Sequence, residues 1–557
     1  MAPLSARRVG KPDLVGPAVA VGIFLLYQAT FSSVPTSDAL TYSRFIDSGD
    51  YSRILFPNAM LTSYSFFQLK RLLIGVGFTP PTFELIRAVN ALSAALSGFL
   101  FYRTVLLLGG GPFWGAVGAG LLAGSYGFWY FANGEMHHLA MVFVLLVFYL
   151  LLRWRMLDAP ITPAFVCGAA LLNVAAGFFH QEHFLFGLSA VALLMVGRPL
   201  REGARDAALY AGAGIAGSAG VLLVMGGGVL GLGSLDAIRR WYFWQLDRPL
   251  EEFVSESPLL VGARLIKGQL TAWLFGTQVL ADVARRPELF GYARVVVFSL
   301  LTLAAYAIAV ILLRELWRRR KAAGQTLLVP LIAAVVWLVS YPLLLGWYFP
   351  AVTEYYLKTV PPLILVLLMG AIAAERQALA RRTAVVLLAL VVGVNFSSAI
   401  WPWYRYGQAI SAFDSGFDAR FRADDLFISF ESGLDNTIKG RTRFLALKGL
   451  FDREGRETGF RTVREAIEAQ LARGGRVFAY NLVPGSFSLK TLNDHLRNSR
   501  VERYRREEFE AFSQELQRRY VFQEVFRYWE EAQEPLYLFG ERLQPLWEIR
   551  ERTPSKS

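Results

Sequence analysis

Residues 137–153 read HHLAMVFVLLVFYLLLR, an apolar run that begins at His137 and His138 and ends at Arg153. A helix needs roughly twenty apolar residues to cross the hydrocarbon core of a bilayer, and this run is close to that length. The polar residues at its two ends are placed as they would be at the two membrane surfaces. The run therefore predicts a membrane-spanning helix.

The same pattern recurs along most of the chain. Hydrophobic residues make up 54% of the 557 residues, and they come in long runs, which argues against a soluble protein. We expect a polytopic α-helical membrane protein with about eleven transmembrane helices. The predicted spans lie near residues 14–33, 84–107, 112–131, 137–153, 162–180, 183–197, 207–232, 292–314, 327–349, 356–374 and 382–402.

Basic residues cluster in alternate loops, for example at Arg7 and Arg8 and again at Arg198, Arg201 and Arg205. The positive-inside rule assigns such loops to the cytoplasm, so the N-terminus is expected inside and the C-terminus outside. The net charge of +13 is spread over these loops and does not favour a nucleic-acid partner. The composition is compatible with an integral protein of a bacterial inner (plasma) membrane.

Two parts of the chain are expected. Residues 1–403 form the membrane domain, with a first outer loop at 34–82 and a long outer segment at 233–290. Residues 404–557 are polar and predict a small extracytoplasmic α/β domain.

Within the polar part, Leu426–Phe430 and Arg476–Tyr480 are typical of strands. Val463–Leu471 predicts an amphipathic helix that ends at Gly474-Gly475, and residues 501–520 predict a charged helix.

The first outer loop carries Asp38 directly after the first span. A carboxylate at the bilayer surface, partly removed from water and held in one position, suits a general base. The alternative is a structural role, because Ser37 or Asp38 could simply begin a helix. Both interpretations remain open at this point.

Two histidine clusters follow, Glu135 with His137 and His138, and His180-Gln181-Glu182-His183. Topology places both at the outer face, where ionisable groups at membrane depth usually mark a site. Glu135 could instead favour the start of a helix, and the second cluster could be the polar part of a tight turn. A divalent metal is a sharper alternative, with His180, His183 and Glu182 as ligands of Zn or Mn.

Further outer residues could bind an anionic substrate. Arg239 and Arg240 lie in an amphipathic stretch that suits a helix in the membrane interface. Glu354, Tyr355 and Lys358 precede the tenth span. Lys358 could reach toward lipid headgroups, or it could bind the phosphate of a lipid-linked substrate.

The order of these motifs resembles the GT-C superfold of membrane glycosyltransferases, the group that uses polyprenyl-phosphate sugars and includes protein mannosyltransferases and aminoarabinose transferases. The matching segments are Asp38 after the first span, Phe56–Leu61, Glu135-Met136 before a span that ends at Arg153, Phe179-His180-Gln181, and Glu354-Tyr355-Tyr356 followed by Pro361-Pro362. Two features depart from the family pattern: Asp38 has no acidic neighbour, and His137-His138 follow the second acidic site.

The resemblance implies a GT-C-like fold and an outer-face glycosyl transfer from a polyprenyl-phosphate sugar to a lipid, glycan or protein acceptor. Asp38 would take the proton of the acceptor hydroxyl, with Glu135 as a second catalytic carboxylate. His137, His138, His180, Gln181, Glu182, Glu354, Tyr355, Lys358, Arg239 and Arg240 would bind substrate.

Three other classes compete with this interpretation. A multi-spanning transporter would place its ionisable groups near the middle of the membrane and show internal repeats, which the hydropathy does not favour. A ligase or polymerase of lipid-linked glycans would use an oligosaccharide donor. A structural membrane subunit would use the histidines only to stabilise turns.

Overall fold

The computed structural model describes residues 13–33, 37–157, 160–243, 257–285, 292–319, 324–348, 353–374, 376–429, 438, 441–447, 450, 456–480, 506–529 and 543–552. Its contacts divide the chain into a helical unit and a C-terminal unit, with the main division between Ile400 and Trp401.

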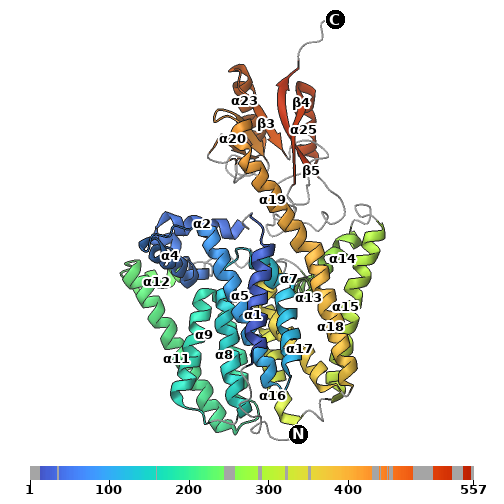
Figure 1. Ribbon diagram of the computed structural model, residues 1–557. Helices are drawn as coiled ribbons and strands as arrows, with labels where there is room; N and C mark the ends of the chain where they lie inside the picture. The colour runs from blue at the N-terminus through green and yellow to red at the C-terminus, as the bar shows by residue number, and fades with distance from the viewer. Residues whose placement is uncertain are drawn as a thin grey trace. The chain divides into compact units, whose positions relative to one another are not determined.

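The helical unit is a bundle whose elements follow each other along the chain (Figure 1). They are α1 (Val15–Thr30), α2 (Ser37–Ser48), α3 (Tyr51–Ile54), η2 (Pro57–Ala59), α4 (Met60–Gly75), α5 (Thr82–Leu107), α6 (Pro112–Gly124), α7 (Tyr126–Phe131), α8 (His138–Leu157), α9 (Pro163–Phe179), η3 (Gln181–Leu185), α10 (Phe186–Met195), α11 (Leu200–Leu222), η4 (Leu223–Val229), α12 (Leu235–Tyr242), α13 (Pro258–Trp273), α14 (Gly276–Arg285), α15 (Tyr292–Arg319), α16 (Gly324–Tyr348), η7 (Thr353–Thr359), α17 (Val360–Ala373), α18 (Gln377–Asn395) and η8 (Phe396–Ile400).

The apolar helices coincide with the predicted spans. Six helical segments are long and apolar enough to cross a membrane, among them Thr82–Leu107 and His138–Leu157. Five shorter apolar helices lie at the other predicted spans. The chain is therefore a polytopic α-helical membrane protein. Helix α8 packs against α5, α9 and α10, and it buries Val144, Leu145 and Phe148 in the main hydrophobic core.

The predicted span 112–131 is wrong as a single helix. It divides into α6 and α7 at Ser125, whose backbone is extended and whose hydroxyl donates to the carbonyl of Leu122. The side chain of Asn395 donates to the carbonyls of Gly124 and Trp273, at 2.9 Å each, and accepts from the N–H of Phe275 at 2.8 Å. One amide thus satisfies the backbone where α6 and α13 end, so the break needs no continuous helix.

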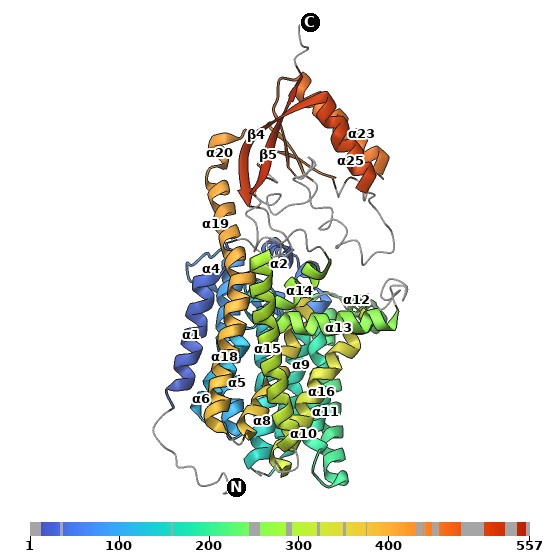
Figure 2. The ribbon, with the colours of Figure 1, turned by 90° about the vertical axis from the view of Figure 1, so that its right-hand side faces the viewer.

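Short helices lie at one end of the bundle. Figure 1 shows α2 and α4 of the first outer loop and α12 of the long outer segment at that end. Figure 2 shows α13 running across the direction of α15 and α16. The amphipathic helix expected around Arg239 is α12, which begins with a cap from Ser234 to the N–H of Ala237 and buries Ile238.

The C-terminal unit contains a five-stranded sheet in the order β2-β1-β3-β5-β4. Strand β1 pairs in parallel with β2 and β3, while β5 pairs antiparallel with β3 and β4. The elements of this unit are α19 (Trp401–Ser415), α20 (Phe417–Arg420), β1 (Leu426–Ser429), β2 (Arg443–Ala446), α23 (Arg456–Ala472), β3 (Val477–Tyr480), α25 (Arg506–Arg519), β4 (Tyr520–Trp529) and β5 (Leu543–Glu551).

Alternation along β1 gives this sheet two covered faces. Leu426 and Ile428 pack in one core with Ile467 of α23 and Leu516 of α25. Phe427 points the other way and stacks on Phe478, with the rings of Phe417 and Phe421 beside them. The expected α/β composition of this segment is confirmed.

Candidate active site

A buried ion pair joins two segments far apart in the sequence. Lys358 lies in η7 and has no exposed side-chain surface, and its Nζ pairs with a carboxylate oxygen of Glu182, which is 7% exposed. Glu182 is held in η3, the short helix between α9 and α10. Two charges at this depth are costly unless each compensates the other. The pair therefore fixes η3 against η7.

Two imidazole rings lie beside this pair. The ring centroids of His137 and His180 are 4.2 Å apart, and both side chains are buried. Both residues stand in turns between apolar helices. Burial lowers the pKa of each imidazole, and the nearby Lys358 ammonium lowers it further. At neutral pH the two rings are therefore neutral, so they can donate or accept hydrogen bonds without adding charge.

The other two histidines of the clusters have structural partners. His138 Nε2 lies 2.8 Å from the carbonyl oxygen of Phe128, and the ring meets Phe128 edge-on. His183 Nδ1 lies 3.1 Å from the hydroxyl of Tyr341, at the other side of the His180 ring. These contacts anchor both ends of the His137–His180 pair.

The turn before α8 connects this cluster to the first outer loop. Asn90 donates to the carbonyl of Glu135 at 2.8 Å, and the Glu135 side chain is 4% exposed. Gly134 has a φ of +150°, and a Cβ there would lie 2.5 Å from Cβ of Ala39. Ala39 directly follows Asp38, so the backbone of Asp38 lies close to the Glu135 turn.

The first outer loop also contacts the histidine turn between α9 and α10. Thr62 donates its hydroxyl to the carbonyl of Phe179 at 2.5 Å, and Ser63 contacts the sulfur of Met136 at 3.8 Å. Both residues follow the Phe56–Leu61 patch. Loop one, the Glu135 turn and the His180 turn therefore meet at one end of the bundle, as expected from topology.

Other expected site residues lie apart from this cluster or outside the described part of the chain. Arg239 and Arg240 are exposed on α12 and both pair with Asp236, at 3.3 and 2.5 Å. Gln181 begins η3 beside Glu182 and is half-buried. The side chains of Asp38, Glu354 and Tyr355 lie outside the described residues, although α2 begins at Ser37, as the helix-start alternative expects.

No family model and no curated protein matches the chain. Two solved structures are similar to it. Arabinofuranosyltransferase AftD from Mycobacteria has 15% identity and a TM-score of 0.43, and the match covers 98% of this chain and 40% of AftD. ArnT from Cupriavidus metallidurans, solved with bound undecaprenyl phosphate, has 12% identity and a TM-score of 0.45, with 96% and 97% of the two chains covered. The chain therefore spans about two fifths of AftD, and at these TM-scores the likeness carries no argument about activity.

The metal alternative finds its three residues in separate contacts. Glu182 faces Lys358, and His183 faces Tyr341, while His180 stacks on His137. Within the described residues, no group of three or more His, Cys, Asp or Glu side chains could hold a metal ion. The metal set stays a prediction.

Three contributors to this site escaped the sequence analysis: Asn90, Tyr341 and the pairing of Lys358 with Glu182. Asn90 and Tyr341 lie within apolar runs and carried no separate signal. The ion pair did leave one, because a lone acid and a lone base at membrane depth usually pair with each other.

Proposed function

We propose that this protein is a membrane glycosyltransferase that moves a sugar from a polyprenyl phosphate to an acceptor hydroxyl at the outer membrane face. The observation that carries the proposal is the buried cluster of His137, His180, Glu182 and Lys358 beside the loop that begins with Asp38. Such a group of ionisable side chains, at one end of an apolar bundle, is costly without a function. The motif resemblance supplies the donor class.

In the proposed reaction, Asp38 takes the proton of the acceptor hydroxyl as its oxygen attacks the anomeric carbon of the sugar. The bond between that carbon and the phosphate oxygen breaks, and polyprenyl phosphate leaves with the electron pair. Lys358 supplies positive charge near the leaving phosphate, and the neutral His137 and His180 offer hydrogen bonds. Glu182 holds Lys358 in position until substrate arrives.

The first test asks whether the protein carries its donor. The lipid extracted from full-length purified protein is read by mass spectrometry. A polyprenyl-phosphate sugar is the expected species, and the same lipid then serves as labelled donor for a transfer assay. Turnover of no such lipid by a folded preparation, with membrane extract as the source of acceptor, would contradict the proposed reaction.

The second test concerns Asp38. Asp38→Asn keeps the shape but removes the proton acceptor, so turnover should fall by about a hundred- to ten-thousandfold. Asp50→Asn is the matched control, since Asp50 lies in the same loop and caps α3 through the N–H of Ser52 at 2.9 Å. Asparagine caps a helix as well as aspartate does, so this control should stay near wild type. Near-normal turnover of Asp38→Asn would reduce Asp38 to a helix-start residue.

A further inference from the structure

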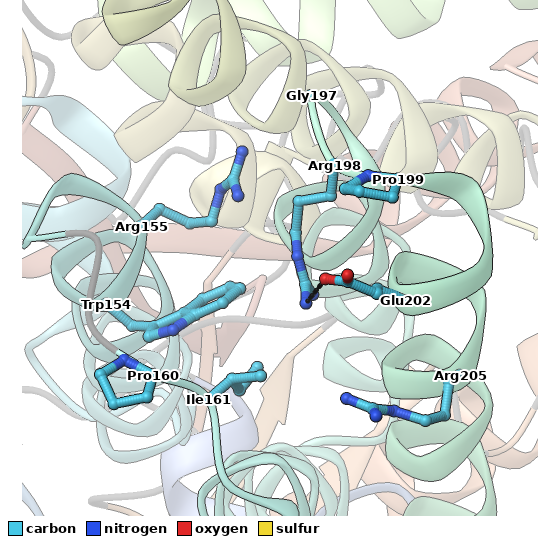
Figure 3. A pocket seen from close by; sticks show the side chains of 9 residues that line it. All are labelled: Trp154, Arg155, Pro160, Ile161, Gly197, Arg198, Pro199, Glu202 and Arg205. Atoms are coloured by element: carbon cyan, nitrogen blue, oxygen red, sulfur yellow. Dashed lines mark hydrogen bonds and ion pairs between the residues drawn. The ribbon is translucent and has the colours of Figure 1, made fainter.

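A pocket of about 430 Å³ lies at the end of α8 opposite to the histidine cluster. Helix α8 has 20 residues, so its two ends are about 30 Å apart. The pocket forms where the α8–α9 and α10–α11 connections meet. Figure 3 shows six of its side chains turned toward a shared space: Trp154, Arg155, Ile161, Arg198, Glu202 and Arg205.

Guanidinium groups dominate the charged lining. Among the described residues that line the pocket, three are arginines and one, Glu202, is a carboxylate. Arg198 is 9% exposed and is fixed by Asp206 at 2.8 Å, while Arg155 donates to the carbonyl of Val196 at 2.8 Å. These donors are held in place before any ligand binds. A preorganised set of guanidinium groups is suited to phosphate, which accepts two parallel N–H bonds from one arginine.

Trp154 organises two of these cations. Its ring lies 5.1 Å from the guanidinium carbon of Arg198 and 5.5 Å from that of Arg155. A tryptophan with an apolar body and a polar edge is common at the level of lipid headgroups. The indole and the two guanidinium groups thus mark the depth at which a headgroup would lie.

Apolar side chains flank the pocket on the outside of the bundle. Leu157, three residues after Trp154, is 53% exposed, and Leu200, directly after Pro199, is 76% exposed. A free phosphate ion would gain nothing from them, whereas acyl chains would cover them. The neighbouring apolar surface therefore favours a lipid over a soluble anion.

We propose that this pocket binds the phosphate-bearing headgroup of an anionic phospholipid, with its acyl chains along Leu157 and Leu200. The positive-inside rule assigns this end to the cytoplasmic leaflet, whose anionic lipids attract basic segments. The site is separate from the proposed transferase site, so either can fail without the other.

Lipid retention tests the proposal. Full-length protein is incorporated in nanodiscs with equal amounts of phosphatidylglycerol and phosphatidylcholine, and the lipids that remain bound after release are counted by native mass spectrometry. Wild type should retain phosphatidylglycerol over phosphatidylcholine. Arg155→Gln with Arg205→Gln should weaken retention about thirty-fold, because each basic residue near a headgroup contributes about fivefold.

Arg153→Gln with Arg201→Gln is the matched control. Both residues are exposed, lie on the same two helices and remove the same charge, yet neither lines the pocket. This control should retain phosphatidylglycerol as wild type does. An equal loss in the control would assign the effect to a diffuse basic surface, and equal retention of the two lipids by wild type would also overturn the proposal.

Two further arms keep the result decisive if the double variant folds poorly. Glu202→Gln removes the one carboxylate of the lining and should raise phosphatidylglycerol retention about fivefold. Unchanged or lower retention would contradict the site. An excess of inorganic phosphate should leave the bound lipid in place, and its full displacement would indicate a soluble-anion site instead.

Discussion

At the end of the helical unit where α8 begins, the Lys358 and Glu182 side chains are 0% and 7% exposed, whereas at the end where it stops Arg205 and Glu202 are 68% and 58% exposed. The first set forms an ion pair that water barely reaches. The second set surrounds a pocket and pairs at the surface. Buried charges are strongly coupled to stability and surface charges weakly, so the two ends should respond differently to substitution.

The comparison is broken first if the two ends do not face opposite sides of the membrane. In a Cys167→Ala background, Ser48→Cys at the α2 end should react with an impermeant thiol reagent on intact cells, while Arg201→Cys at the α11 end should not. Both positions are exposed. The effect should be all or none, and both should react after permeabilisation. Labelling of Arg201→Cys alone on intact cells would invert the predicted orientation.

The next largest effect concerns the buried pair. Lys358→Met leaves Glu182 buried without its partner and should cost about 3–5 kcal/mol, seen as a lower thermal midpoint of tryptophan fluorescence in detergent. Lys70→Met is the control, because its partner Asp47 is 50% exposed and such a pair contributes about 1 kcal/mol or less.

A double variant sharpens this result. Lys358→Met with Glu182→Gln removes both charges, so most of the lost stability should return. A double variant that is less stable than Lys358→Met alone would mean that the two charges are not coupled.

A smaller effect is expected where loop one meets the Glu135 turn. Gly134→Ala imposes an unfavourable φ and a contact with Ala39, so it should cost about 3 kcal/mol and also lower turnover by shifting Asp38. Gly49→Ala is the control, since Gly49 has a φ of +67° but nothing within 4 Å of a built Cβ. It should cost about 1 kcal/mol. Equal losses would show that the contact with Ala39 has no energetic weight.

The smallest effect belongs to the pocket end. Arg198 and Glu202 are 3.5 Å apart, and Glu202 is exposed, so Glu202→Gln should change stability by less than about 0.5 kcal/mol. Asp206→Asn should cost more in the same thermal assay, because Asp206 is 3% exposed and pairs with Arg198 and Arg205. A large loss from Glu202→Gln would remove the distinction between the two ends.

Hydropathy alone located the apolar helices, because bilayer thickness sets their length. It missed the break at Ser125, since the stabilising contact comes from Asn395, far away in the sequence. In the C-terminal unit, β1 and β3 were predicted, but β2, β4 and β5 were not. Strand β4 carries the signal that should have been used, a run rich in aromatic and β-branched residues from Tyr520 to Trp529.

The meeting of the histidine clusters at one end followed from topology, yet the division of labour within them did not. The sequence places His137 and His138 side by side, but only His137 stacks on His180, while His138 is bound to a backbone carbonyl. Which of two adjacent side chains faces a site depends on the rotation of α8 about its axis. Packing against α5, α9 and α10 sets that rotation.

The amide of Asn395 has a consequence for the order in which the protein is made. It donates to the carbonyl of Gly124, which leaves the ribosome 271 residues earlier. At about 5–20 residues per second, that carbonyl waits roughly 15 to 55 seconds for its partner. The end of α6 is therefore completed only when α18, the last helix of the bundle, has entered the membrane. A chain truncated before α18 would keep the ends of both α6 and α13 without the group that joins them.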